Sequence, residues 1–373
     1  SSKINRSMLY LSRGEIMTIF RKGELFSGPG GIALGAKNAS VFLGNEEYKI
    51  QHVWANDFDH DSCETFRLNI TPDNPQSVIE GKVEDLNLED LPPIDAFTFG
   101  FPCNDFSGVG KKRGTDGYFG KLYKYGIKVI EKFNPQWFLA ENVEGLSSAN
   151  QGEAFRNILS ELSSVGKGYT LTPHLYKFQE YGVSQLRHRI IIVGIRNDID
   201  VTFKVPAPIT KSHLIPVSKV LEDMPNDLPN HELPVHKKEV IERLKKIPPG
   251  ENAWYSGLPE EYRLKVKGLK LSSIYRRLHP DFPSYTVTAS GGGGTHGYHY
   301  AEPRALTNRE RARIQSFPDD YKFIGKKESV RKQIGMAVPP QGVQVIFEAI
   351  LKTFAGIEYK NVNSNINMEE LIK

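Results

Sequence analysis

The 373-residue chain contains only two cysteines, Cys63 and Cys103, so neither a disulfide framework nor a cysteine cluster for a metal is expected. No run of about 18 or more apolar residues occurs, which predicts no membrane span. No long apolar segment follows the first residues, so no secretory signal is expected. The formal net charge is only +4, and this total by itself identifies no partner.

The charge is distributed unevenly. Between residues 235 and 280 there are eleven Lys and Arg residues against five Glu, a local balance of +6. Such a stretch fits a polyanion such as nucleic acid, although a solvated basic surface explains it equally. The remaining composition, 39% hydrophobic and 25% charged, is typical of a soluble globular protein large enough for one large and one smaller domain.

Short apolar runs alternate with helical patterns in the first half of the chain, which predicts an α/β fold with a mostly parallel sheet covered on both faces. The expected strands are 23–27, 53–56, 94–99, 137–140 and 190–195, and the expected helices begin near 32, 62, 123 and 155. After Arg196 recurrent prolines replace this alternation, which predicts a second, irregular domain. Regular structure returns with a helix from Thr307 to Gln315, capped by Thr307 and Glu310, and a closing helix at 342–354.

A glycine turn lies between the first predicted strand and helix. Phe26-Ser27-Gly28-Pro29-Gly30-Gly31-Ile32-Ala33 fits a loose dinucleotide-binding pattern, but a tight structural turn fits it equally. Asp57 follows the next strand, where an acid can bond ribose hydroxyls. Phe58 beside it can stack on an adenine or belong to the core. Together these residues predict an adenosine-bearing cofactor.

Cys103 lies on a glycine-flanked turn, Gly100-Phe101-Pro102-Cys103-Asn104-Asp105-Phe106-Ser107-Gly108, directly after a predicted strand. Since a packing cysteine would more often lie within the apolar run, we interpret Cys103 as a nucleophile. A thiol needs a helix N-terminus or a cation to favour its thiolate.

Two further polar groups occur at strand ends. Glu141, in Glu141-Asn142-Val143, follows the strand at 137–140, and the carboxyl ends of parallel strands share one edge, so Glu141 and Cys103 should converge with the glycine turn. Gln185-Leu186-Arg187-His188-Arg189 precedes the strand at 190–195. Arg187 and Arg189 alternate to one face of a strand and can point at a carboxylate or phosphate, although an exposed basic strand end is the simpler alternative.

The ordered set of motifs resembles the DNA (cytosine-5)-methyltransferase family of the prokaryotic restriction-modification type. The resemblance covers nearly the whole chain and rests on the glycine turn, Gly100 to Cys103, Glu141 to Val143, Gln185 to Arg189, Arg277-Leu278, Thr286-Val287-Thr288, residues 306–318 and residues 334–340. It implies a Rossmann-like S-adenosylmethionine-dependent methyltransferase domain, residues 1–195 plus 301–373, and a smaller irregular target-recognition domain, residues 196–300.

The resemblance also implies a mechanism, in which Cys103 attacks C6 of a flipped-out cytosine and C5 then receives the methyl group. Glu141 would hold N3 and the exocyclic amine, and Arg189, with Arg187 close by, would hold O2 and orient Glu141. The residues implied to contact the cofactor are Phe26, Gly28, Gly30, Gly31, Asp57, Phe58, Pro102, Leu122, Ala337 and Val338.

The implied cofactor is S-adenosylmethionine, which leaves as S-adenosylhomocysteine, and no metal is expected. The implied partner is double-stranded DNA, bound by a monomer in the prokaryotic cytoplasm at the nucleoid and not at a membrane. The recognised DNA sequence, and whether a restriction enzyme accompanies the protein, do not follow from the chain.

Three residues depart from the family pattern. Asn104 stands in place of glutamine after the cysteine, Lys82 replaces an acid that binds the adenine amine, and Met336 replaces an asparagine. Three other functions stay open. A transfer-RNA cytosine-5 methyltransferase would carry Cys-Phe-Thr, which is missing here. A nicotinamide-dependent dehydrogenase explains the glycine turn alone, and an inactive DNA-binding relative would not require the chemical residues.

Overall fold

The computed structural model describes residues 7–10, 16–101, 121–143 and 152–372. Within these residues the chain forms two compact units. Unit 1 comprises the described parts of residues 1–177, 188–208 and 343–373, and unit 2 comprises residues 178–187 and 209–342. Cys103, Pro102 and Asn104 lie outside the described residues.

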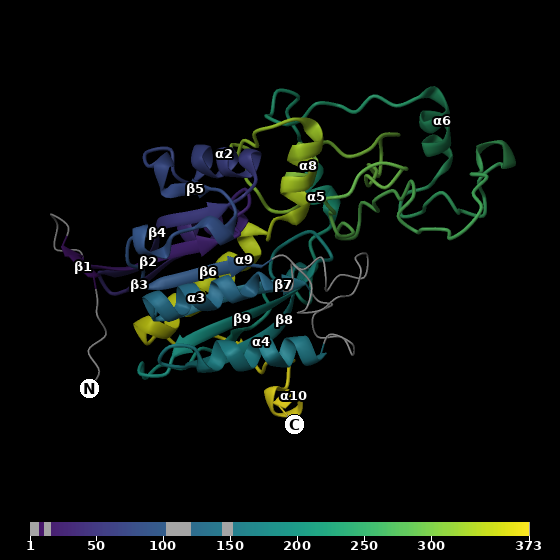
Figure 1. Cartoon of the computed structure of the whole chain (residues 1–373). Helices are drawn as coiled ribbons and strands as arrows, with labels where there is room; N and C mark the ends of the chain where they lie inside the picture. Colours follow the sequence, from purple (N-terminus) through teal and green to yellow (C-terminus); the bar gives the residue numbers. More distant parts are fainter. Residues whose placement is uncertain (1–6, 11–15, 102–120, 144–151, 373) are drawn as a thin grey trace. The chain divides into compact units, whose positions relative to one another are not determined.

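Unit 1 is built on one mixed sheet (Figure 1). Its main strand order is β3-β4-β2-β6-β7-β9-β8, with β1 paired to β2 and β5 paired to β4. The strands are β1 (Ser7–Tyr10), β2 (Ile16–Leu25), β3 (Ser40–Leu43), β4 (Glu46–Asp57), β5 (Val78–Glu80), β6 (Ala96–Gly100), β7 (Trp137–Val143), β8 (Tyr169–Lys177) and β9 (His188–Arg196).

The parallel centre of the sheet is the part that the sequence predicts. Strands β4, β2, β6 and β7 are parallel neighbours, and β5 joins β4 in the same direction. The expectation of a mostly parallel sheet is nevertheless wrong, because β9 runs antiparallel to both β7 and β8, and β3 runs antiparallel to β4. The sheet is therefore mixed, within the α/β class expected.

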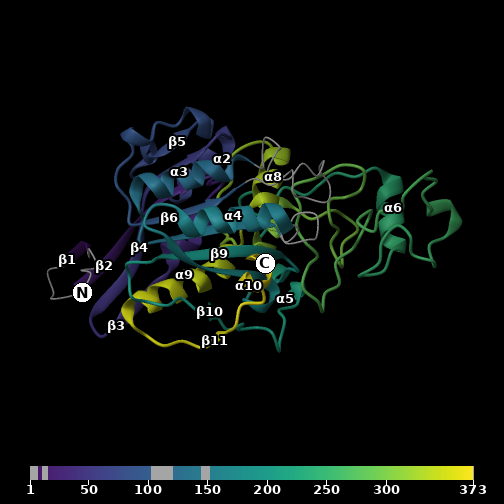
Figure 2. The ribbon, with the colours of Figure 1, turned by 60° about the horizontal axis from the view of Figure 1, so that its bottom comes forward.

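Helices cover both faces of this sheet (Figures 1 and 2). One face carries α3 (Tyr123–Phe133) and α4 (Gly152–Ser164), which pack on a core that includes Phe97, Phe99 and Phe138. The opposite face carries α9 (Pro340–Ala355), whose Phe347 and Phe354 contact Trp137 and Phe20. Unit 1 also contains α1 (Gly31–Asn38), α2 (His60–Asn69), α10 (Met368–Ile372) and the short pair β10 (Val205–Pro206) and β11 (Asn361–Val362).

Unit 2 has little regular structure, as the recurrent prolines predict. Its helices are α5 (Val217–Leu221), α6 (Lys238–Lys246), α7 (Asn308–Ile314) and α8 (Lys327–Met336), and it also contains the start of α9. The predicted capping of α7 is confirmed, since Thr307 accepts from the backbone N–H of Glu310 and the Glu310 carboxylate accepts from that of Thr307. This reciprocal pair satisfies two of the N–H groups that a helix start leaves without partners.

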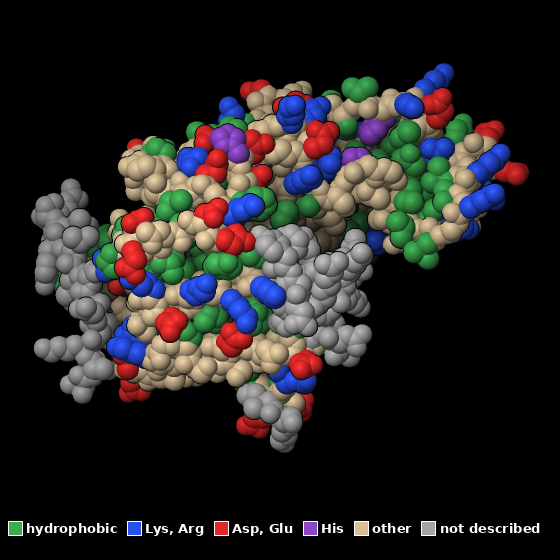
Figure 3. All heavy atoms as spheres, viewed as in Figure 1, with side chains coloured by type: hydrophobic (Ala, Val, Ile, Leu, Met, Phe, Trp, Pro, Cys, Tyr) green, Lys and Arg blue, Asp and Glu red, His purple; other side chains and the backbone are tan. Residues whose placement is uncertain are grey.

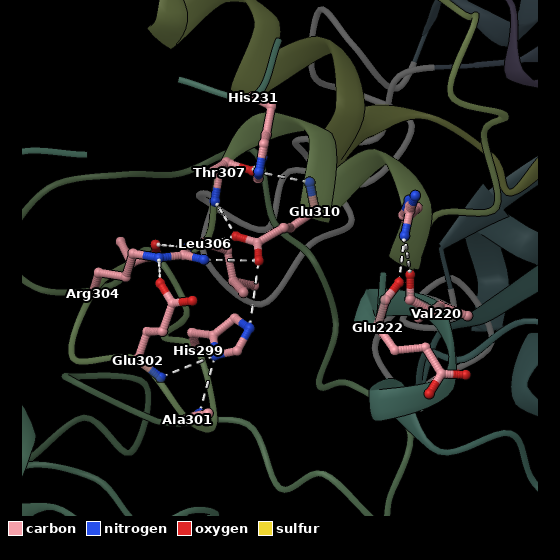
Figure 4. Close-up of polar contacts among 12 residues, drawn as sticks. Val220, Glu222, His231, His299, Ala301, Glu302, Arg304, Leu306, Thr307 and Glu310 are labelled. Atoms are coloured by element: carbon pink, nitrogen blue, oxygen red, sulfur yellow. Dashed lines mark hydrogen bonds and ion pairs between the residues drawn. The ribbon is translucent and has the colours of Figure 1, made fainter. Parts of the chain in front are cut away.

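A polar cluster fixes the start of α7 within unit 2 (Figure 4). Arg304 donates to both oxygens of Glu310 at 2.6 and 3.1 Å, and His299 lies 3.5 Å from the same carboxylate. Burial is the largest single effect on Glu310 and opposes its ionisation. The hydrogen bonds and charge of Arg304, the Thr307 N–H and the charge of His299 together outweigh burial and hold the pKa of this carboxyl below its usual value. The ionised Glu310 carboxylate therefore binds Arg304 and His299, which belong to the irregular segment that precedes the helix.

The segment Lys327–Ala355 is long and apolar enough to cross a membrane by length and composition alone. In the structure 72% of its apolar window is buried inside the protein. The segment also consists of two helices, α8 and α9, separated by the extended residue Ala337. These features are those of core helices.

Candidate active site

The carboxyl ends of β2, β4, β6 and β7 lie at one edge of the unit 1 sheet, because these strands are parallel. The glycine turn and the predicted polar residues lie at the ends of these strands. The glycine turn leaves β2 after Leu25, Asp57 ends β4, Gly100 ends β6, and Glu141 lies near the end of β7.

The turn between β2 and α1 has an unusual backbone. Phe26, Gly28 and Gly30 all have positive φ values, of 54°, 53° and 107°. A phenylalanine in this region is strained, and such strain is concentrated at binding sites. Among residues 7–10, 16–101, 121–143 and 152–372, no atom lies within 4 Å of a Cβ built on Gly28, so these residues leave open space beside this turn. Gly30 caps α1 without a side-chain hydrogen bond, so the helix start at Gly31 keeps N–H groups available to a ligand.

Asp57 connects the glycine turn to the next strand. Its Oδ2 accepts from the N–H of Gly28 at 2.8 Å, and its Oδ1 accepts from the N–H of Asp59 at 2.9 Å. Burial raises the pKa of Asp57 to about 6, although both N–H donors oppose this shift. The ring of Phe58 is 70% exposed and follows Asp57 directly. It is therefore a surface ring and not the core aromatic that the sequence left as an alternative.

These residues fit an adenosine-bearing cofactor. The open glycine turn and the uncapped helix start suit a close, polar ligand, the Asp57 carboxylate suits ribose hydroxyls, and the exposed Phe58 ring suits an adenine face. Leu122, expected at the methionine end, is the N-cap residue of α3 and is buried in the core of unit 1. Ala337 and Val338 are buried residues that follow α8 in unit 2, and their cofactor contacts stay predictions.

Glu141 and Arg189 form an ion pair on neighbouring strands. Arg189 Nε lies 3.4 Å from Glu141 Oε1, and the two side chains are 17% and 13% exposed. Because β9 is antiparallel to β7, its amino end lies at the same edge as the carboxyl end of β7, where Arg189 pairs with Val143. The chain thereby brings an acid and a guanidinium together at the edge where the glycine turn also lies.

Arg187 has different partners. It lies just before β9 in unit 2, and its side chain is 1% exposed. Its guanidinium donates to Gln185 Oε1, to the carbonyl of Val287 at 2.9 Å and to the carbonyl of Gly335 at 2.8 Å. These bonds connect three distant segments of unit 2, which gives Arg187 a structural role that the sequence did not predict.

Gly100 also lies within this site. It is the register partner of Glu141 in the parallel pair of β6 and β7. The sequence analysis assigned it no role of its own, and the available signal was a glycine as the last residue of an apolar strand before the Phe-Pro-Cys motif.

Comparison with known proteins identifies the family. The family model described as C-5 cytosine-specific DNA methylase matches residues 20–352. The chain belongs to this family. This methylase is 61% identical to the Type II methyltransferase M.BbvI of Brevibacillus brevis, over 94% of this chain and 96% of that protein. It is 40% identical to the Type II methyltransferase M.NgoFVII of Neisseria gonorrhoeae, over 93% of this chain and 90% of that protein.

Solved structures show the same fold for this methylase. A prophage-encoded protein of E. coli aligns with a TM-score of 0.71 at 22% identity, over 90% of this chain and 99% of that one. The S. pombe Dnmt2 methyltransferase aligns with a TM-score of 0.61 at 15% identity, over 91% of this chain and all of that one. The expected Rossmann-like methyltransferase fold is thus confirmed, as is the family that the motifs predict.

Proposed function

We propose that this methylase transfers a methyl group from S-adenosylmethionine to C5 of cytosine within a specific double-stranded DNA sequence. The observation that carries the proposal is the Glu141–Arg189 pair at the edge of the sheet that also carries the glycine turn. An acid beside a guanidinium suits the Watson–Crick edge of a cytosine, since the acid can bond N3 and the amine while the guanidinium bonds O2.

The residues would act in a fixed order. Glu141 holds N3 and the exocyclic amine of the flipped base, which makes the ring electrophilic at C6, and Arg189 holds O2 and orients Glu141. The Cys103 thiolate bonds to C6, and C5 gains the electron density needed to accept a methyl group. Loss of the C5 proton then expels the thiolate and restores the aromatic ring. The bound S-adenosylmethionine supplies the methyl group, and Asp57 and the glycine turn would hold its adenosine part.

The irregular segment 196–300 is proposed as the target-recognition domain, with residues 1–195 and 301–373 as the catalytic domain. Its support is the basic stretch of unit 2, where Lys265, Lys267 and Lys270 are exposed beside the exposed Leu269. Figure 3 shows Lys and Arg side chains around hydrophobic ones on the unit 2 surface near α6. Lysines suit phosphates and apolar side chains suit base edges in a groove.

We further propose a restriction-modification role, in which methylation protects DNA from a partner restriction enzyme. The support is the 61% identity to a Type II methyltransferase along nearly the whole chain. We also propose that the protein acts on DNA as a monomer in a prokaryotic cytoplasm; the bacterial source of M.BbvI and M.NgoFVII supports the prokaryotic setting.

Two measurements test the proposed chemistry. Bisulfite sequencing of DNA from cells that express the protein should show cytosine-5 methylation within one short sequence, and unmodified DNA would refute the proposal. The Cys103→Ser variant should lose methyl transfer and still bind DNA. In addition, DNA with 5-fluorocytosine at the target should trap a covalent complex, because fluorine cannot leave C5 as the proton does. Turnover on ordinary DNA without trapping would reject the C6 adduct.

A further inference from the structure

Gly100 lies directly beside the Glu141 carboxylate. The two residues are register partners in the parallel strands β6 and β7, so their side-chain positions lie on the same face of the sheet. A Cβ built on Gly100 would lie 2.8 Å from Glu141 Oε2 and 3.7 Å from Ile32 Cδ1 of helix α1. A separation of 2.8 Å is shorter than side chains tolerate, so any residue other than glycine would overlap with the carboxylate.

The backbone itself does not require glycine at position 100. Gly100 ends a regular strand and does not have a positive φ, so an alanine could adopt the same backbone conformation. Among the described residues, the group that leaves no room for a side chain at position 100 is therefore the Glu141 carboxylate.

The Glu141 carboxylate is confined on its other side by Arg189. The guanidinium Nε lies 3.4 Å from Oε1, while Oε2 is the oxygen that faces Gly100. Arg189 also donates from Nη1 to the carbonyl of His188 at 2.7 Å, which fixes the guanidinium on its strand. One oxygen thus faces a fixed cation, and the other lies against the bare backbone of β6.

We propose that Gly100 is a positioning residue for Glu141. The missing side chain lets the carboxylate lie against β6 in the orientation that presents it to the pyrimidine edge. This inference rests on the proposed role of Glu141. In a Gly100→Ala variant, rotation of the Glu141 side chain relieves the overlap at little cost to the fold, because the overlapping atom is the end of a flexible side chain.

The expected displacement is large enough to affect catalysis. Restoring an ordinary contact of 3.4 Å from 2.8 Å moves the oxygen by about half an ångström. Catalytic groups must be held within about 0.5 Å of their productive geometry, so this displacement reaches the limit, and about 1 Å can cost on the order of 100-fold in rate. Gly100→Ala should therefore slow methyl transfer by about 10- to 100-fold.

The test is single-turnover methyl transfer with tritiated S-adenosylmethionine. The matched control is Gly152→Ala in α4, where a Cβ would meet no atom of the described residues within 4 Å. The control should keep the wild-type rate. The methyl-transfer rate of Gly100→Ala should be reduced, while its affinity for DNA and for S-adenosylmethionine stays within about twofold of wild type. Its Tm should fall by no more than about 3 °C. A wild-type rate in Gly100→Ala, or a larger fall in its Tm, would overturn the inference.

A double-mutant cycle with Glu141→Gln separates positioning from a general structural effect. If Gly100 acts through Glu141, adding Gly100→Ala to Glu141→Gln should cause no further loss of rate. An equal loss in both backgrounds would mean that Gly100 acts through another group, and the inference would be wrong. If Glu141→Gln alone kept the wild-type rate, the proposed role of Glu141 would fail instead.

Discussion

Replacing Lys22 by methionine should destabilise the protein by roughly 1–4 kcal/mol at pH 7. Lys22 and Glu24 lie on β2 with side chains that are each 1% exposed, and the Lys22 ammonium lies 2.5 Å from Glu24 Oε1. The substitution leaves the carboxyl group buried without its cation. Methionine is similar to the lysine stem in size, so the loss of packing should be small.

The magnitude follows from the protonation of Glu24. Burial already raises its pKa, against the opposing effect of Lys22. Without Lys22 the carboxyl avoids a buried charge by binding a proton. For a group with an ordinary pKa near 4.3, this costs about 3.7 kcal/mol at pH 7, at about 1.4 kcal/mol per pH unit. This value is the upper limit of the loss relative to wild type, because the pKa of Glu24 is already raised when Lys22 is present. The value agrees with the roughly 3–5 kcal/mol measured when one partner of a buried ion pair is removed.

The same reasoning gives the sign of the pH dependence. In the Lys22→Met variant the folded pKa of Glu24 lies well above its unfolded value, so the folded state binds the proton more tightly. The variant should therefore be closest to wild type in acid, and the difference should grow with pH above the raised wild-type pKa of Glu24, by at most about 1.4 kcal/mol per pH unit.

Urea unfolding at about pH 5, 6 and 7 measures this loss. The control is Lys132→Met, which removes a surface pair with Glu89 and should cost less than about 1 kcal/mol. A loss below about 1 kcal/mol for Lys22→Met at pH 7, or a loss that does not change with pH, would refute the reasoning.

Three further results are expected. Thr307→Ala should lower stability by about 0.5–2 kcal/mol through loss of the α7 capping box, whereas Thr307→Ser should keep most of it, as thermal unfolding would reveal. The pKa of Asp57 is raised to about 6, so its carboxylate, which accepts the Gly28 N–H, becomes neutral as pH falls through 6. The KM for S-adenosylmethionine should therefore increase over this pH range. The same pH profile in Asp57→Asn would contradict this explanation. Arg187→Met should lower the Tm, because the buried carbonyls of Val287 and Gly335 lose the hydrogen bonds that Arg187 donates. Arg189→Met should instead lower the methyl-transfer rate with little change in Tm. The reverse pattern would invalidate both assignments.

Local features of the fold could be predicted from the sequence. The helix starts after the glycine turn and after Thr307 lie where the residues predict them, because caps and turns depend on a few neighbouring residues. The strands at β6 and β7 were also predicted, since buried parallel strands are continuous apolar runs. For β2 and β4 only the carboxyl ends were predicted, because their first residues mix charged and apolar side chains.

Pairing direction and long-range contacts could not be predicted. The run Ile190–Ile195 identifies a buried strand, but nothing within it shows that β9 is antiparallel to β7. The bonds from Arg187 to Val287 and Gly335 likewise join residues far apart in sequence. Strand β8 was missed because its polar and apolar residues, Tyr169–Lys177, give no clear pattern.

The antiparallel direction of β9 also affects when the site can form during protein synthesis. Glu141, Gly100 and the glycine turn leave the ribosome before β8 and β9 do, and the guanidinium of Arg189 reaches Glu141 only after β9 has paired with β7. This pairing closes a loop that contains α4 and β8, which is a slow, non-local step. A nascent or truncated chain that ends before β9 would therefore contain Glu141 without the guanidinium that pairs with it in the folded protein.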